Sequence, residues 1–160
     1  MNRFFPEGAL LDTPDNQRLI QSPAALAEAS MEGRVVEARA VLCDAEHNLH
    51  VEMPCMEGII PYMEGAIGIA EGTTRDIALI SRVSKPISFL VQGFEYQPDG
   101  SRRAVLSRRA AQEKCRFEYV ASLRPGDIVP ARITRLETFG AFCDIGCGLP
   151  ALMPIASISV

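Results

Sequence analysis

Two phenylalanines that lie three positions apart, Phe139 and Phe142, are the residues of this sequence best suited to binding by stacking. Aromatic rings on a strand offer π-faces on which nucleobases stack, at about 1–3 kcal/mol per base. Arg132 and Arg135 precede them and could hold phosphates through salt-dependent contacts. Residues three apart in a regular strand point to opposite faces, so both rings are exposed together only if the chain bends at Gly140. Without that bend, the rings belong to a core.

No set of residues expected of a catalytic centre is apparent. The chain lacks a P-loop and a Ser/His/Asp arrangement, and Gly146-x-Gly148 does not continue into a dinucleotide-binding fingerprint. The five cysteines are odd in number and form no Cys-x-x-Cys pair, which indicates reduced, partly buried thiols. Cys143 and Cys147 would need two further ligands to bind zinc. We therefore expect no enzyme, no metal and no other cofactor.

Charge is distributed unevenly along the chain, whose net charge is −4. Residues 37–76 carry eight acidic against two basic residues, and residues 82–116 carry eight basic against three acidic ones. Such asymmetry can create a basic face on an acidic protein, although a solvated helix face explains a short arginine cluster equally well. The candidate phosphate contacts in the basic stretch are Arg102, Arg103, Arg108 and Arg109.

The elements that must position these residues are mainly strands. Residues 1–32 form a lead-in that is irregular over its first 20 positions and then contains a short helix with Ser22 as its cap, Pro23 at its first position and Gly33 closing it. Residues 33–107 alternate as short strands, including the β-prone runs 77–83 and 87–94, with a glycine-rich insertion after residue 61. This pattern favours a small closed barrel, and a β-sandwich would give a similar one.

A helical pattern from Arg108 predicts a linking helix over residues 108–123, ended by Pro125-Gly126. Residues 124–160 then predict three strands: one over 127–136, one over 141–145, and one over 149–155 after a glycine turn. Gly140 marks a bend or a close approach of two backbones. The linking helix is the clearest domain boundary in the chain.

The order and spacing of motifs in the last unit resemble the first half of an S1 domain, an RNA-binding repeat with the OB fold. The residues that carry the resemblance are Gly126-Asp127-Ile128-Val129, Ile133-Thr134-Arg135, Phe139-Gly140-Ala141-Phe142-x-Asp144-Ile145-Gly146-x-Gly148 and Leu152-Met153-Pro154-Ile155. Residues 33–107 resemble the family more weakly and contain no Phe-Gly-x-Phe. The fold expected from the resemblance is a tandem of OB-type (S1-type) five-stranded barrels, of which the second is incomplete at Val160.

The resemblance implies an RNA-binding protein of the ribosomal protein S1 type, which holds single-stranded mRNA at the small ribosomal subunit during translation. In the family the two aromatics lie on the face where bases stack, and Arg103 or Arg102 matches a basic position that touches RNA. Pro154 stands where the family often has a histidine. The first barrel could instead dock on the ribosome or on another protein, and the missing strands could come from another chain by exchange.

Two alternatives remain open at the sequence level: an accessory module of an exoribonuclease or of an enzyme fusion, and a protein-docking OB domain. No apolar run reaches the length of a membrane span, and the N-terminus lacks the apolar region of a secretory signal. We expect a cytoplasmic protein without a membrane partner.

Overall fold

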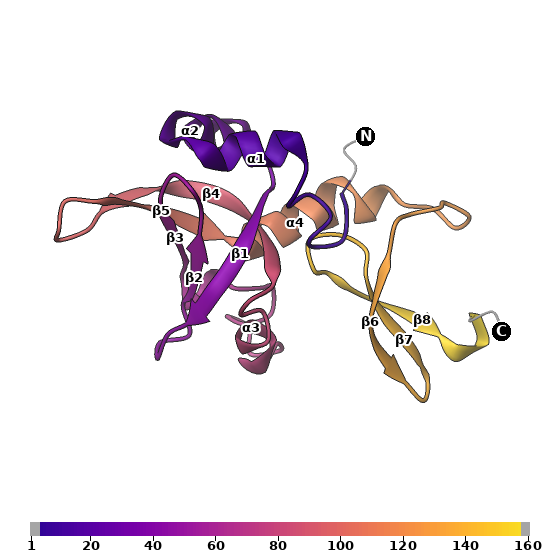
Figure 1. Ribbon diagram of the computed structural model, residues 1–160. Helices are drawn as coiled ribbons and strands as arrows, with labels where there is room; N and C mark the ends of the chain where they lie inside the picture. The colour runs from indigo at the N-terminus through magenta and orange to yellow at the C-terminus, as the bar shows by residue number, and fades with distance from the viewer. Residues whose placement is uncertain (1–3, 158–160) are drawn as a thin grey trace.

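A computed structural model of the chain describes residues 4–157; residues 1–3 and 158–160, the ends of the first and last predicted units, lie outside the described residues. The fold is mainly β, and its largest unit is a closed five-stranded barrel (Figure 1). The barrel order is β1-β2-β3-β5-β4, built from β1 (Val36–Cys43), β2 (Leu49–Glu52), β3 (Glu57–Ile60), β4 (Pro86–Tyr96) and β5 (Arg102–Ser107).

Two pairings between strands distant in sequence close this barrel. Strand β3 runs parallel to β5, and β1 runs antiparallel to β4, with Val36 opposite Phe89. Alternate residues of each strand fill the interior, which removes apolar surface from water and provides the main driving force for folding. Closure decides between the two architectures that the alternating pattern allowed, because a sandwich leaves two separate sheets. The buried strand residues include Val36, Ala38, Ala40, Leu49, Val51, Ile60, Ile87, Phe89, Val91, Ala104 and Leu106.

Two short helices cover one side of the barrel. Helix α2 (Pro23–Glu32) begins and ends as predicted: the Ser22 hydroxyl accepts from the Ala25 amide, and Gly33 closes the helix in the left-handed conformation. Helix α1 (Pro14–Gln21) corrects the expectation of an irregular lead-in. The sequence does contain a helix-start signal here, because Thr13 caps the helix by accepting from the Asn16 amide and Pro14 occupies the first position.

The glycine-rich insertion between β3 and β4 contains a 3-10 turn (Tyr62–Glu64) and a short helix, α3 (Ile77–Ile80). The expectation of a strand over residues 77–83 was therefore wrong. The backbone there makes local bonds, with the Ser81 amide donating to the Ile77 carbonyl. Leu79 is buried in the core and Val83 packs against it, while Ile77 and Ile80 face solvent. Packing against the core thus overrides the β-propensity of the run.

Helix α4 (Arg108–Glu118), followed by a 3-10 turn (Val120–Ser122), lies between the barrel and the second unit (Figure 1). One side of the helix packs against β4 of the barrel. Its buried face contributes Ala111, Cys115 and Tyr119 to a second core that also contains Phe4 and Cys147. The helix therefore joins the N-terminal segment to the turn that contains Cys147.

The second unit is a three-stranded antiparallel sheet in the order β6-β7-β8, from β6 (Arg132–Glu137), β7 (Gly140–Asp144) and β8 (Pro150–Pro154), with a 3-10 turn at Ile155–Ser157. Three strands occur in the region for which three were predicted, although β6 begins at Arg132 rather than at Asp127. The described residues contain one closed barrel and this open three-stranded sheet, so the predicted tandem of barrels is not confirmed. None of the helices within residues 4–157 has the length and apolar character needed to cross a membrane.

Candidate nucleic-acid interface

The two predicted stacking residues lie together at the β6–β7 hairpin. Phe139 sits in the turn, 52% exposed, and Phe142 lies in β7 with its ring partly exposed. Their ring centroids are 6.0 Å apart, and the rings are perpendicular. Because Phe139 precedes the strand, the alternation that would send the two rings to opposite faces does not apply. The hairpin therefore presents an aromatic pair on one surface.

Gly140 allows this arrangement by a close approach of two strands, as the sequence predicted. A Cβ atom at this position would overlap with the carbonyl oxygen of Met153 in β8. Gly140 lies opposite Pro154 in the ladder, and the Ile155 amide donates to the Phe139 carbonyl at 2.9 Å. The glycine thus holds the turn that carries Phe139 against the third strand.

Arg135 lies with its guanidinium 4.7 Å from the centroid of the Phe142 ring, and its Nε forms an ion pair with the Glu137 carboxylate at 2.8 Å. Planar guanidinium groups stack on aromatic faces and can also hold phosphate. The guanidinium covers one face of Phe142, so Phe139 offers the more open ring. Arg132 is half-exposed on the same strand, 3.7 Å from the Asp144 carboxylate.

The other four predicted arginines do not join this surface. Arg102 and Arg103 lie at the start of β5, on the long β4–β5 hairpin that extends away from the β6–β8 sheet (Figure 1). Arg102 stands over the Phe94 ring, and Arg103 is paired with Glu95. Arg109 faces three carboxylates, those of Glu64, Glu71 and Glu113. Much of the basic charge counted in the sequence is therefore neutralised locally.

Arg108 requires a correction, because it is 5% exposed and belongs to the interior. Its Nε and Nη2 donate to the two carboxylate oxygens of Glu7 at 2.8 and 2.7 Å, and its Nη1 donates to the Gly65 carbonyl. A bidentate pair of this kind occupies the donors that a phosphate would need. Arg108 thus organises the fold and is not placed for a surface contact.

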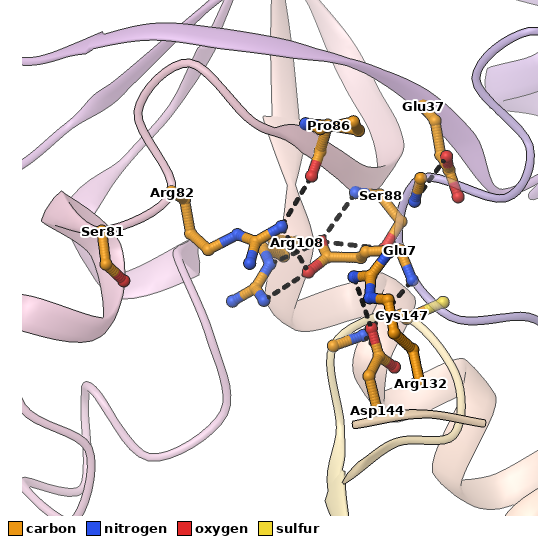
Figure 2. A network of polar contacts seen from close by, with 12 residues as sticks. Glu7, Glu37, Ser81, Arg82, Pro86, Ser88, Arg108, Arg132, Asp144 and Cys147 are labelled. Atoms are coloured by element: carbon orange, nitrogen blue, oxygen red, sulfur yellow. Dashed lines mark hydrogen bonds and ion pairs between the residues drawn. The ribbon is translucent and has the colours of Figure 1, made fainter. Parts of the chain in front are cut away.

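Sequence reasoning missed the polar network around Glu7, which Figure 2 shows from close by. Besides Arg108, Glu7 accepts from the Ser88 amide at 2.9 Å, and its own amide donates to Asp144 at 2.8 Å. Burial by itself would raise the pKa of Glu7, but the adjacent Arg108 and Arg82 guanidinium groups hold it below its usual value. No local pattern marks Glu7, because its partners lie 81, 101 and 137 positions away.

A second buried carboxylate, that of Glu37, holds the N-terminal segment to the barrel. Glu37 of β1 accepts from the amides of Gly8 and Leu10, at 2.9 and 3.1 Å. Burial raises the pKa of Glu37 to about 7, an effect that these amides oppose and the nearby charge of Glu7 increases. Residues 5–10 are therefore fastened both to the barrel and, through Asp144 and Cys147, to the second unit.

Two histidines lie on the barrel, away from the aromatic hairpin. The ring of His50 is hydrogen-bonded on both sides, to Asp44 and Glu57 at 2.9 Å each. Its hydrogen bond to Asp44 lowers the pKa of that carboxyl to about 2. Within residues 4–157, no three His, Cys, Asp or Glu side chains gather closely enough to hold a metal ion.

The fold and this surface together define a β protein with a closed OB-like barrel and an exposed aromatic hairpin flanked by arginines. Over 69 residues, the chain is 33% identical to small ribosomal subunit protein bS1 of Staphylococcus aureus strains COL, MSSA476 and MRSA252. The similar region covers 41% of this chain and 17% of each relative, so the chain spans a small part of those proteins. No model of a known protein family matches the chain. The similarity supports an S1-like domain.

Proposed function

We propose that this protein binds single-stranded RNA on the β6–β7 hairpin, without catalysing a reaction. The observation that carries the proposal is the pairing of Phe139 and Phe142 on one surface, 6.0 Å apart between centroids. Two rings at one site can hold neighbouring bases of a flexible strand, and stacking needs no particular base. Duplex RNA hides its bases from such contacts, which favours a single-stranded ligand.

The two arginines of β6 supply the electrostatic part of the proposed site. Arg135 already stacks on Phe142, so its guanidinium can contact a phosphate beside a base on the same hairpin. Arg132 is half-exposed and close to a single carboxylate, that of Asp144. Because the overall charge is −4, binding has to depend on this local charge, and its affinity falls as salt rises.

The similarity to bS1 supports a finer assignment, which we also propose. The name of these relatives places them in the small ribosomal subunit, and we propose that this chain likewise acts on mRNA in translation, in the cytoplasm. The first barrel has no counterpart of the aromatic hairpin, which favours a role for it in docking to the ribosome or to another protein.

The direct test measures fluorescence anisotropy of a short labelled oligouridylate titrated with the 160-residue chain. Replacing both phenylalanines, Phe139→Ala with Phe142→Ala, is expected to weaken binding by at least about tenfold, because each stacked base contributes about 1–3 kcal/mol. Tyr96→Ala is the matched control, since Tyr96 is a 77% exposed aromatic on the remote β4–β5 hairpin. Equal affinity of the double variant and the wild type would refute the stacking site.

A further inference from the structure

A cleft of about 680 Å³ lies between the barrel insertion and the second sheet. One wall is formed by the glycine-rich insertion and α3, including Gly68, Thr74 and Ala78, and the opposite wall by Thr134, Arg135 and Phe142. Its volume lies within the range of pockets that hold small ligands. Because Phe142 belongs to both, the cleft is continuous with the aromatic hairpin described above.

The cleft is lined by four arginines and two carboxylates, and both carboxylates are already occupied. Glu7 is bound bidentately by Arg108. Asp144 accepts from the amides of Glu7, Gly146 and Gly148. Four guanidinium groups against two carboxylates leave the lining of the cleft with an excess of positive charge.

Besides Arg108, three arginines line the cleft: Arg82, Arg116 and Arg135. Arg82 also lies 3.4 Å from Glu7, and Arg135 is paired with Glu137. The Nε of Arg82 is buried and, among the described residues, has no hydrogen-bond acceptor. A buried donor left without a partner is costly and calls for an acceptor. Arg116 is exposed on α4 and stands 5.3 Å from the Phe117 ring centroid, and it belongs to none of the ion pairs found within residues 4–157.

We propose that this cleft binds backbone phosphates of the RNA strand whose bases stack on Phe139 and Phe142. The inference rests on the proposed function and extends it, because it gives the strand a path from the hairpin, past Arg135, to Arg82 and Arg116. Guanidinium groups match phosphate oxygens in geometry and charge, and they read no base. The cleft thus adds affinity that is independent of sequence.

The test uses the same oligouridylate anisotropy titration over a series of salt concentrations. Arg116→Gln is expected to weaken binding by about 3–10-fold at low salt and to reduce the slope of log affinity against log salt by about 0.7, the value of one lost phosphate contact on a single strand. Arg124→Gln is the matched control, because Arg124 is an exposed arginine outside the cleft. Its affinity and slope should equal those of the wild type.

A second pair of variants introduces a negative charge on α3, at one position inside the cleft and one outside it. Ala78→Glu lies in the cleft and should weaken binding more than Arg116→Gln, whereas Ile80→Glu, on the same helix but outside the cleft, should not. Thermal unfolding followed by circular dichroism identifies the folded variants that enter the comparison.

The outcomes separate this inference from the proposed function. If Arg116→Gln and Ala78→Glu bind like the wild type while the double phenylalanine variant does not, the cleft proposal is overturned and the stacking site stands. If the cleft variants lose affinity and the phenylalanine variant retains it, the cleft is supported and the stacking site falls. A wild-type chain that binds no RNA overturns both.

Discussion

Single residues in this protein acquire their roles from partners far away in the chain. Glu7 is a surface-type residue in the N-terminal segment, yet it is 1% exposed and binds Arg108, which is itself buried at the start of α4. Taking two such charges out of water is costly, and the cost is met only while both are paired and hydrogen-bonded. Removing one partner therefore costs more stability than the intact pair contributes, because the other charge is left buried without a counter-charge.

Glu7→Gln is expected to lower the free energy of unfolding by about 3–5 kcal/mol, because it leaves the Arg108 charge buried without a counter-charge. Chemical denaturation followed by circular dichroism measures this loss. Glu113→Gln is the control, since Glu113 forms a more exposed pair with Arg109 on the same helix, at 3.1 Å, and should change stability by less than about 1 kcal/mol. Similar losses in the two variants would contradict the structural role of Glu7.

At the level of elements, the three-stranded sheet depends on the close packing of β7 against β8. Gly140 leaves room for the Met153 carbonyl, and the hairpin that carries Phe139 is held to the third strand at this point. A glycine weakens the interior of a strand, but it is found there where another backbone approaches too closely for a side chain. The position of the aromatic pair is thus a property of the β6–β7–β8 meander as a whole.

Gly140→Ala should destabilise the sheet by about 1–3 kcal/mol, as overpacking does in other interiors, and should increase amide hydrogen exchange along the β7–β8 ladder. Gly93→Ala serves for comparison, because Gly93 also lies within a strand and an added Cβ there meets no atom within 4 Å. The prediction fails if exchange in β8 is equally slow in both variants.

On the scale of the whole molecule, residues 5–10 fasten the barrel to the second unit. Glu7 and Gly8 reach Arg108, Asp144 and Glu37, while Phe5 accepts a hydrogen bond from the Cys147 amide. The carboxyl of Glu37 has a raised pKa, which means that the folded protein takes up a proton there more readily than the unfolded chain. Stability is therefore linked to pH through this junction.

The free energy of unfolding should fall as pH rises from about 4.5 to 7, because the proton that Glu37 binds preferentially in the folded state is lost over that interval. The size of the effect is up to about 3 kcal/mol. Glu37→Gln keeps an acceptor for the Gly8 and Leu10 amides and should flatten this part of the profile.

Denaturation at a series of pH values measures the free energy of unfolding of the wild type and of Glu37→Gln. His50 contributes with the same sign at higher pH. Partial burial would lower its pKa, but its bonds to Glu57 and Asp44 raise it, so that contribution disappears only above pH 6.5. A parallel slope in the wild type and in Glu37→Gln between pH 4.5 and 7 would contradict the assignment to Glu37.

Much of the local structure could be predicted from the sequence by itself. Alternation and turn residues located the strands, Ser22 and Gly33 bounded α2, and Gly140 marked the close approach that brings Phe139 to the surface with Phe142. These features depend on neighbours within a few residues, where backbone geometry and capping act directly. The helix at Pro14–Gln21 also had such a signal, in Thr13 and Pro14.

Only the tertiary structure decided which charges are exposed and which segments meet. Barrel closure through β3 and β5, the burial of Arg108 against Glu7, and the helical turn at residues 77–80 all depend on contacts between distant parts of the chain. So does the arginine-lined cleft, whose walls come from the barrel insertion and the second sheet. Local propensity carries no information about such contacts, because burial is set by the packing of the whole molecule.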